Sequence, residues 1–278
     1  MRKARQAVLS GPDEALLRWV GFFGYLTVDQ LLRLLYQDSS RSYVQKRLKA
    51  LAVGAEPYLI RDRVPGKRVG GSTAYYYTLS TRGARLIERL GIDVPRRKRP
   101  SEQRTLSFEH LQHHLDTNDV HIAFFLAEKA GQLTVTSSET EWQLRTRGMR
   151  ITPDAFLDVA FNQFRYPFAI ELDRGTEVQA VWRRKVRAIV GWYEQQYHAV
   201  FGTTSLTVLV VVAQGGELRL KNLLHWTQAE LMAQGRGDYA TLFQMTCTPV
   251  AQREALLFGD VWQNPGREQP LRIWDDAP

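Results

Sequence analysis

Residues 153–177 read PDAFLDVAFNQFRYPFAIELDRGTE, and this stretch decides the fold of the larger part of the chain. It contains two short β-rich segments, residues 155–161 and 167–173, which predict two strands. Asp154 follows Pro153 at the start of the first strand.

Two further carboxylates, Glu171 and Asp173, lie near the end of the second strand, and alternation places both on the same sheet face. If the two strands are neighbours, Asp154 joins them at one edge of the sheet. Carboxylates gathered in this way bind Mg²⁺ or Mn²⁺, which activates water and stabilises the transition state of phosphodiester hydrolysis. Like charges at that distance repel, so such a cluster is seldom kept without a cation or a shared proton. Asp154, Glu171 and Asp173 are therefore the candidate metal ligands and catalytic acids.

Patterns on either side of this stretch complete an α/β domain. A helix is expected at about 108–131, and a second at about 176–198 with Thr176 as its cap. Residues 206–213 are continuously apolar, which is typical of a buried central strand. The other elements are a strand at 133–137, a helix at about 218–234 and a strand at 240–246. The order α-β-β-β-α-β-α-β predicts a three-layer α/β/α arrangement on a mixed sheet.

The positive charge of the chain is concentrated in its first third. Residues 1–105 hold 21 Lys and Arg against 9 Asp and Glu, a net charge of +12. Residues 106–278 hold 16 against 20, a net charge of −4, which leaves +8 for the 278 residues. A basic first third joined to a mildly acidic remainder indicates a nucleic-acid-binding module attached to a second domain.

The first third has the element order of a winged helix-turn-helix. A first helix ends at Gly24, Thr27 caps a second, and Ser39 or Ser40 caps a third. Two aromatic, β-rich strands follow at 58–60 and 74–79, joined by a basic loop at 61–71, and a final helix spans 82–90.

Such a domain places its third helix in the major groove of double-stranded DNA and its wing against the backbone or minor groove. The candidate DNA contacts are Arg41, Gln45, Lys46 and Lys49 on the helix, and Lys67 and Arg68 on the wing. The alternative is that these charges form an ordinary solvated face. Winged helices also bind proteins, so the fold alone does not settle the partner.

The predicted domain plan has four parts. Residues 12–91 form the winged helix-turn-helix, and residues 92–106 form a linker with two prolines around Arg96–Arg99. Residues 107–250 form the α/β domain, and residues 251–278 form a C-terminal extension. The fold class is thus a two-domain α+β and α/β protein, and the four cations of the linker add candidate phosphate contacts.

The acidic pattern resembles the PD-(D/E)XK nuclease superfamily, with Pro153-Asp154, a spacer and Glu171-Leu172-Asp173. The resemblance implies that the first acid and the Glu bind metal and that a lysine occupies the position of Asp173. This chain departs from the pattern there. Some members of the superfamily have an acidic residue there, and others take the lysine from the following helix, where this chain offers Lys185, with Arg183 and Arg184 beside it.

The whole chain also resembles the replication-relaxation family of plasmid and mobile-element proteins, over roughly residues 12–250. The segments that carry this resemblance are Tyr77-Thr78-Leu79-Ser80-Thr81-Arg82-Gly83, His113-His114-Leu115-Asp116-Thr117-Asn118-Asp119-Val120, Pro153-Asp154 and Glu171-Leu172-Asp173-Arg174-Gly175-Thr176-Glu177. It implies a role in plasmid replication or DNA relaxation, and it supports DNA binding more than cleavage.

The sequence therefore predicts a DNA-binding protein with a nuclease-like domain, an endonuclease dependent on Mg²⁺ or Mn²⁺. Asp154, Glu171 and Asp173 would form the acidic set, and Lys185 would stabilise the developing charge. The alternative is a catalytically silent nuclease fold that acts by dimerisation and by recruiting other replication or mobile-element proteins. The third option is a transcriptional regulator that acts through the winged helix alone. Glu177 fits either a fourth acid or a charge at the start of a helix.

Several classes of protein are excluded by composition. One cysteine, Cys247, rules out an intrachain disulfide framework and a cysteine-cluster zinc site. No apolar run has the roughly 18 residues of a membrane span, and the N-terminus has no secretory signal, so a cytoplasmic protein without a membrane partner is expected. Phosphate-binding P-loops and dinucleotide-binding glycine motifs are absent from the sequence.

Overall fold

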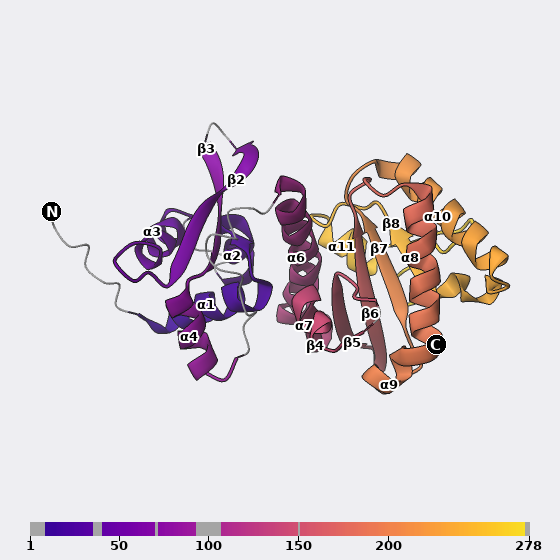
Figure 1. Ribbon diagram of the computed structural model, residues 1–278, viewed down its shortest axis with the longest axis horizontal. Coiled ribbons are helices and arrows are strands. Elements are labelled where there is room, and N and C mark those ends of the chain that lie inside the picture. Colours follow the sequence, from indigo (N-terminus) through magenta and orange to yellow (C-terminus); the bar gives the residue numbers. More distant parts are fainter. Residues whose placement is uncertain (1–8, 36–40, 70–71, 93–106, 150, 276–278) are drawn as a thin grey trace. The chain divides into compact units, whose positions relative to one another are not determined.

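The computed structural model describes residues 9–35, 41–69, 72–92, 107–149 and 151–275, and it divides into two compact units, Met1–Asn118 and Asp119–Pro278 (Figure 1). The division falls inside one long helix, α6 (Phe108–Lys129). Most of the predicted linker, including Arg96–Arg99, lies outside the described residues.

The first unit combines short helices with a small antiparallel sheet. Its helices are α1 (Gly11–Phe23), α2 (Val28–Leu35), α3 (Arg41–Leu51) and α4 (Thr81–Arg89). Its strands are β1 (Leu26–Thr27), β2 (Leu59–Val69) and β3 (Ser72–Leu79), in the order β1-β3-β2. The two-residue strand β1 was not expected from the sequence, because its pairing partner, β3, is about fifty residues further along the chain.

The ends of these helices follow from side-chain caps. Ser10 and Asp13 form a reciprocal capping box at the start of α1, and Gly24 ends that helix with a φ of 79°. The hydroxyl of Thr27 accepts a hydrogen bond from the backbone N–H of Gln30 at the start of α2. The hydroxyl of Ser80 accepts one from the N–H of Gly83 at the start of α4. These partners satisfy backbone donors that a helix leaves without an internal acceptor.

The predicted basic loop 61–71 is wrong in its first part, because the chain continues as a strand to Val69. Arg61, Asp62 and Arg63 pair with successive tyrosines of β3, and the register shifts between Arg63 and Arg68. The irregularity accommodates the Pro65-Gly66 dipeptide, which as a sequence signal favours a turn. Lys67 and Arg68 thus belong to β2, and their side chains lie outside the described set.

The core of the first unit joins its helices to the sheet. Leu16, Leu17 and Val20 of α1 are fully buried, as are Val44 and Leu48 of α3. Arg47 of α3 forms an ion pair with the buried carboxylate of Asp13 in α1. Close packing fixes α4 as well, since a Cβ at Gly83 would lie 2.2 Å from the carbonyl oxygen of Tyr58.

The second unit contains a five-stranded mixed sheet with the order β4-β5-β6-β7-β8, which confirms the mixed sheet that the sequence predicts. Its strands are β4 (Thr134–Thr140), β5 (Ala155–Phe161), β6 (Phe164–Asp173), β7 (Thr207–Val212) and β8 (Phe243–Thr246). The first three are antiparallel, whereas β6, β7 and β8 run parallel to one another. After α6, its helices include α7 (Glu141–Arg145), α8 (Gln179–Trp192), α9 (His198–Phe201), α10 (Gly216–Ala233) and α11 (Arg253–Phe258).

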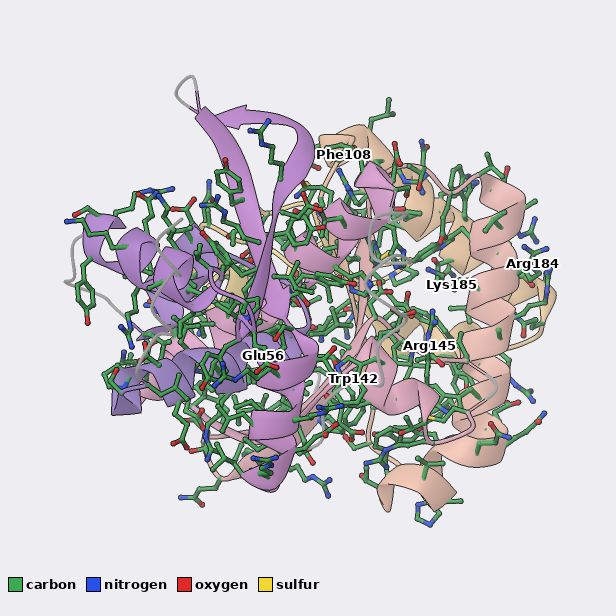
Figure 2. All side chains as sticks on the ribbon, turned by 60° about the vertical axis from the view of Figure 1, so that its left-hand side comes forward. Glu56, Phe108, Trp142, Arg145, Arg184 and Lys185 are labelled. Atoms are coloured by element: carbon green, nitrogen blue, oxygen red, sulfur yellow. The ribbon has the colours of Figure 1, made fainter. Side chains whose placement is uncertain are left out.

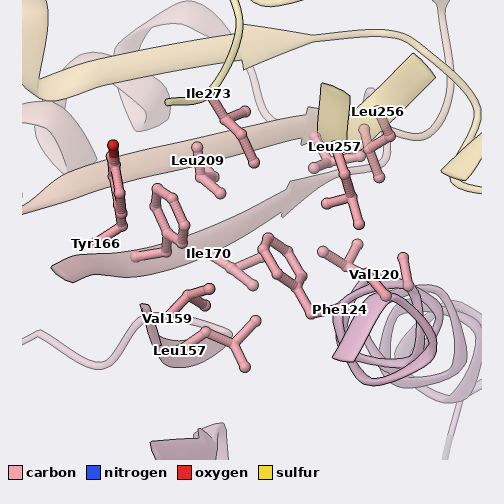
Figure 3. Packing of buried hydrophobic residues seen from close by; sticks show 14 of the residues in the cluster. Val120, Phe124, Leu157, Val159, Tyr166, Ile170, Leu209, Leu256, Leu257 and Ile273 are labelled. Atoms are coloured by element: carbon pink, nitrogen blue, oxygen red, sulfur yellow. The ribbon is translucent and has the colours of Figure 1, made fainter. Parts of the chain in front are cut away.

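Two hydrophobic cores cover opposite faces of this sheet. In the first, Phe168, Ile170 and Leu172 of β6 pack with residues of α6 and α11, as Figure 3 shows for Ile170, Phe124 and Leu257. In the second, Ala169 of β6 packs with residues of α8 and α10. Because side chains alternate along a strand, Glu171 and Asp173 continue the row of Ala169 and face α8 and α10.

The helix expected at about 176–198 is wrong in detail. The helix after β6 is capped at Val178 rather than at Thr176, and it begins at Gln179. It also ends at Trp192, where a π-helical turn, Tyr193–Tyr197, leads into α9. Residues after 250 contribute to the first core, since Trp262 and Trp274 are buried there.

No helix in the described ranges is long and apolar enough to cross a membrane.

Candidate functional site

Asp154 and Glu171 lie opposite each other where β5 begins and β6 nears its end. Ala155 pairs with Ile170 in the antiparallel register. Asp154, which precedes Ala155, is therefore opposite Glu171, which follows Ile170. The Asp154 carboxylate accepts a hydrogen bond of 2.8 Å from the backbone N–H of Leu172, which holds it against β6. Glu171 is buried and Asp154 is half-buried, so one carboxylate of the pair is largely shielded from water and the other reaches it.

Lys185 extends from α8 to this pair. Its Nζ lies 3.0 Å from Oε2 of Glu171 and 2.9 Å from Oε1 of Glu177. Figure 2 labels Lys185 and its exposed neighbour Arg184, which lie on different sides of α8. The lysine is placed by the buried face of the helix, because Trp182 and Val186 on either side of it are core residues. The structure therefore brings together Asp154, Glu171 and Lys185.

The electrostatics of Glu171 are dominated by burial. The pKa of Glu171 is raised to about 7: burial is the largest cause, Lys185 offsets part of it, and the charges on Asp154 and Glu177 add to the rise. An apolar cavity too narrow for water borders this carboxylate and is lined by Pro153, Ala169 and Trp192 among others. The carboxyl group is therefore poised to exchange a proton, or to accept another cation, near neutral pH.

The ammonium of Lys185 stays charged in this environment. Burial lowers its pKa, but the combined charges of Glu171, Asp154 and Glu177 outweigh burial and raise the pKa above its usual value. The cluster of three carboxylates and one ammonium thus keeps a net negative charge when all four groups are ionised. A net negative cluster of this kind favours the approach of a further cation.

Asp173 has a different partner. Its carboxylate forms a two-pronged ion pair with Arg219 of α10, with N–O distances of 2.8 and 2.7 Å. The N–H of Gly175 donates a third hydrogen bond to it at 3.0 Å. Both oxygens are therefore engaged, and we do not retain Asp173 among the candidate metal ligands. In the described part of the chain, no group of three or more His, Cys, Asp or Glu side chains is arranged to hold a metal ion.

Sequence reasoning missed Arg219 as a partner of Asp173. The two residues are 46 positions apart, and only the packing of α10 against the sheet joins them. The sequence did not decide whether Glu177 is a fourth acid of the site or a charge at the start of a helix. In the structure, Glu177 forms an ion pair with Lys185. Arg183, considered beside Lys185, instead pairs with the buried Glu230 of α10.

The candidate DNA contacts of α3 lie on its outer face. Gln45, Lys46 and Lys49 are exposed, and Arg41 is exposed while paired with Asp29. Tyr43, which the sequence did not single out, is 52% exposed on the same helix. An exposed aromatic side chain among basic residues adds to the evidence for a binding surface, and the charge pattern alone does not reveal it.

The comparisons with known proteins identify a family. The model of a family described as replication-relaxation matches residues 17–203. No curated protein matches the chain at a significant level. Among solved structures, restriction endonuclease FokI is similar at 12% identity and a TM-score of 0.24, over 83% of this chain and 46% of that enzyme. The chain thus spans less than half of FokI, and a likeness at this TM-score supports no argument about fold or activity.

Proposed function

The chain belongs to the replication-relaxation family, and we propose that it is a DNA-binding protein of plasmid or mobile-element replication that hydrolyses DNA phosphodiester bonds. The observation that carries the proposal is the contact between Lys185 and Glu171, opposite Asp154. These are the residue types of the PD-(D/E)XK pattern, with the lysine supplied by the following helix instead of the strand. The proposed catalytic set is therefore Asp154, Glu171 and Lys185.

A divalent cation fits the acids of this site. Asp154 and Glu171 are hard oxygen donors that face each other, and the raised pKa of Glu171 reflects burial beside a like charge. Mg²⁺ in nucleic-acid enzymes is held by one or two carboxylates together with water and substrate phosphates, so a third protein ligand is not required. We propose that Asp154 and Glu171 hold Mg²⁺ or Mn²⁺. When bound, the ion would lower the pKa of a water molecule and offset charge on the phosphate.

The chain's own residues have separate roles in this proposal. The N–H of Leu172 keeps the Asp154 carboxylate oriented toward Glu171. Lys185 remains protonated and is held in place by two carboxylates, so its charge is available to stabilise the negative charge that develops on the phosphate. Asp173 and Arg219 fix the end of β6 to α10 and act as positioning residues.

We further propose that the first unit is a winged helix-turn-helix that binds double-stranded DNA. The support is the helix order, the antiparallel β2–β3 pair and the exposed face of α3 with Gln45, Lys46 and Lys49. A winged helix of this kind places its third helix in the major groove. A homodimer would match a palindromic DNA site, and other replication or mobile-element proteins are the expected protein partners.

One observation favours the alternative of a catalytically silent domain. Lys185 already forms an ion pair with Glu171, so a divalent cation must compete with an existing contact. In that case the second unit would serve to dimerise the protein or to recruit partners. The two candidates differ in whether the acidic pair binds a metal.

Calorimetric titration of Mn²⁺ tests the proposal. The wild type is compared with Glu171→Gln, and Asp260→Asn is the control because that acid is exposed and pairs only with the exposed Arg272 in the part described. We expect one Mn²⁺ site in the wild type and the control and none in Glu171→Gln. Equal binding in all three proteins, or none in any, would refute the metal site and favour the silent domain.

A further inference from the structure

A groove in the first unit is lined by residues that lie outside α3. It encloses a cavity of about 600 Å³ between the segment Glu56–Ile60 and helix α4. That volume is within the usual range of ligand sites, roughly 300–1,000 Å³. Arg82, Arg85 and Arg89 line it from α4, and Glu56, labelled in Figure 2, is the single acidic residue of its wall. The groove therefore favours an anionic occupant.

The three arginines form one row. At positions i, i+3 and i+7 of a helix they project from the same face, and with a rise of about 1.5 Å per residue they extend over about 10 Å. Arg85 and Arg89 are exposed, and neither has an ion pair or hydrogen bond with another residue in the ranges that the structure describes. Two cations about 6 Å apart along the helix are placed to contact successive phosphates of one strand.

Arg82 is fixed in a way that suits a nucleobase. Its guanidinium lies 4.1 Å from the centroid of the Tyr58 ring, and it donates hydrogen bonds to the Glu56 carbonyl at 2.8 Å and the Tyr58 hydroxyl at 2.7 Å. A guanidinium plane held against an aromatic ring is a stacking surface for an unpaired base. Ile60 and Leu86 add apolar surface to the same groove.

We propose that this groove binds a single-stranded segment of nucleic acid, with a base stacked on Arg82 and phosphates on Arg85 and Arg89. Duplex DNA fits less well, because its bases are stacked on each other and are not available to the Arg82–Tyr58 surface. The inference rests on the proposed function in that it adds a second nucleic-acid contact to a DNA-binding protein. It gives the protein separate surfaces for a duplex site and for an unpaired strand.

Fluorescence polarisation with the full chain tests the groove. The probes are a labelled oligothymidylate of about 12 nucleotides, within the range of site sizes of such grooves, and a labelled duplex. The test variant is Arg85→Ala/Arg89→Ala. The control, Lys46→Ala/Lys49→Ala, removes the same charge from α3. Alanine favours helix at these exposed positions, and circular dichroism checks the fold of each variant.

We expect the Arg85→Ala/Arg89→Ala variant to bind the oligothymidylate at least tenfold more weakly than the wild type. The slope of log K against log salt for this probe should be reduced by about 1.4, for two lost phosphate contacts. The duplex should bind within twofold of wild type. The α3 control should show the reverse. Binding of the oligothymidylate within twofold of wild type, or equal loss of both probes, would overturn the proposal. Displacement of the oligothymidylate by micromolar thymidine monophosphate would also overturn it and assign the groove to a free nucleotide.

Failure of the groove and failure of hydrolysis give different results. If Arg85→Ala/Arg89→Ala loses the single strand while the wild type does not nick plasmid DNA, only the proposed hydrolysis fails. If nicking depends on Glu171 and the oligothymidylate binds the variant normally, only the groove proposal fails.

Discussion

Lys185 and Glu171 form an ion pair of 3.0 Å between the middle of α8 and the end of β6. The carboxylate is buried, and the lysine is the cation that reaches it from the following helix. The strand position two residues after Glu171 is acidic, and its side chain is committed to Arg219. The strand has no lysine beside these acids, and Lys185 of α8 takes that place.

Substitution of Lys185 is expected to separate catalysis from metal binding. Lys185→Gln removes the charge that would stabilise the phosphate, and we expect plasmid nicking to fall about 100-fold or more. Mn²⁺ affinity should be equal or higher, because the competing ammonium is gone. Arg184→Gln is the matched control, since it removes an exposed cation from the same helix. Nicking by Lys185→Gln at the rate of the Arg184 control would remove Lys185 from the catalytic set.

Asp173 is expected to matter for stability. Asp173→Asn leaves the Arg219 guanidinium, whose side chain is 10% exposed, without its carboxylate. Breaking a buried ion pair from one side costs about 3–5 kcal/mol, so urea denaturation should show a loss of that order. The double variant Asp173→Asn/Arg219→Gln should recover part of it. Loss of Mn²⁺ binding in a still-folded Asp173→Asn protein would instead make Asp173 a ligand.

Sequence patterns located the acids because they depend on local geometry. A period of two residues along 167–173 places Glu171 and Asp173 on one face, and in the structure they contact Lys185 of α8 and Arg219 of α10. The partner of Asp173 could not be found this way, because Arg219 is 46 residues distant and meets it only through the packing of α10. The turn signal of Pro65-Gly66 corresponds to the register shift between Arg63 and Arg68, and β2 continues beyond it because Arg68 and Val69 pair with β3.

The arginine groove had no sequence signal of its own. Arg82, Arg85 and Arg89 have an ordinary helical spacing that is also typical of a solvated face. Only the approach of the 56–60 segment to α4, which Gly83 permits, encloses a cavity beside them. The groove therefore depends on tertiary contacts between distant segments, which a short stretch of sequence does not reveal.

His121 is expected to make stability depend on pH. Burial lowers the pKa of this fully buried histidine of α6 to about 3. Between that value and the unfolded value of about 6.5, only the unfolded state takes up the proton, so the free energy of unfolding falls as pH falls. The loss should approach about 1.4 kcal/mol per pH unit, or about 2 kcal/mol at pH 5 relative to pH 7.

Urea denaturation at pH 7 and pH 5 checks this expectation. The variant His121→Gln has no imidazole to titrate, so its stability should change less between the two values. If wild type and variant lose the same amount, the acid sensitivity belongs to other groups.

The basic face of α3 is expected to set the salt dependence of duplex binding. Lys46→Ala/Lys49→Ala should weaken binding to every duplex similarly and reduce the slope of log K against log salt by about 1.8, for two lost phosphate contacts. Arg184→Ala/Lys221→Ala removes two exposed charges from the second unit and is the control. An unchanged slope for the α3 variant would place the duplex elsewhere on the protein.

Hydrolysis at the Asp154–Glu171 site is tested most directly by nicking of supercoiled plasmid in the presence of Mn²⁺, with the wild type, Asp154→Asn, Glu171→Gln and the control Asp260→Asn. We expect nicked circles with the wild type and the control, and none above background with either site variant while duplex binding is retained. Nicking that persists in Asp154→Asn and Glu171→Gln, or that no protein produces, would contradict hydrolysis at this site.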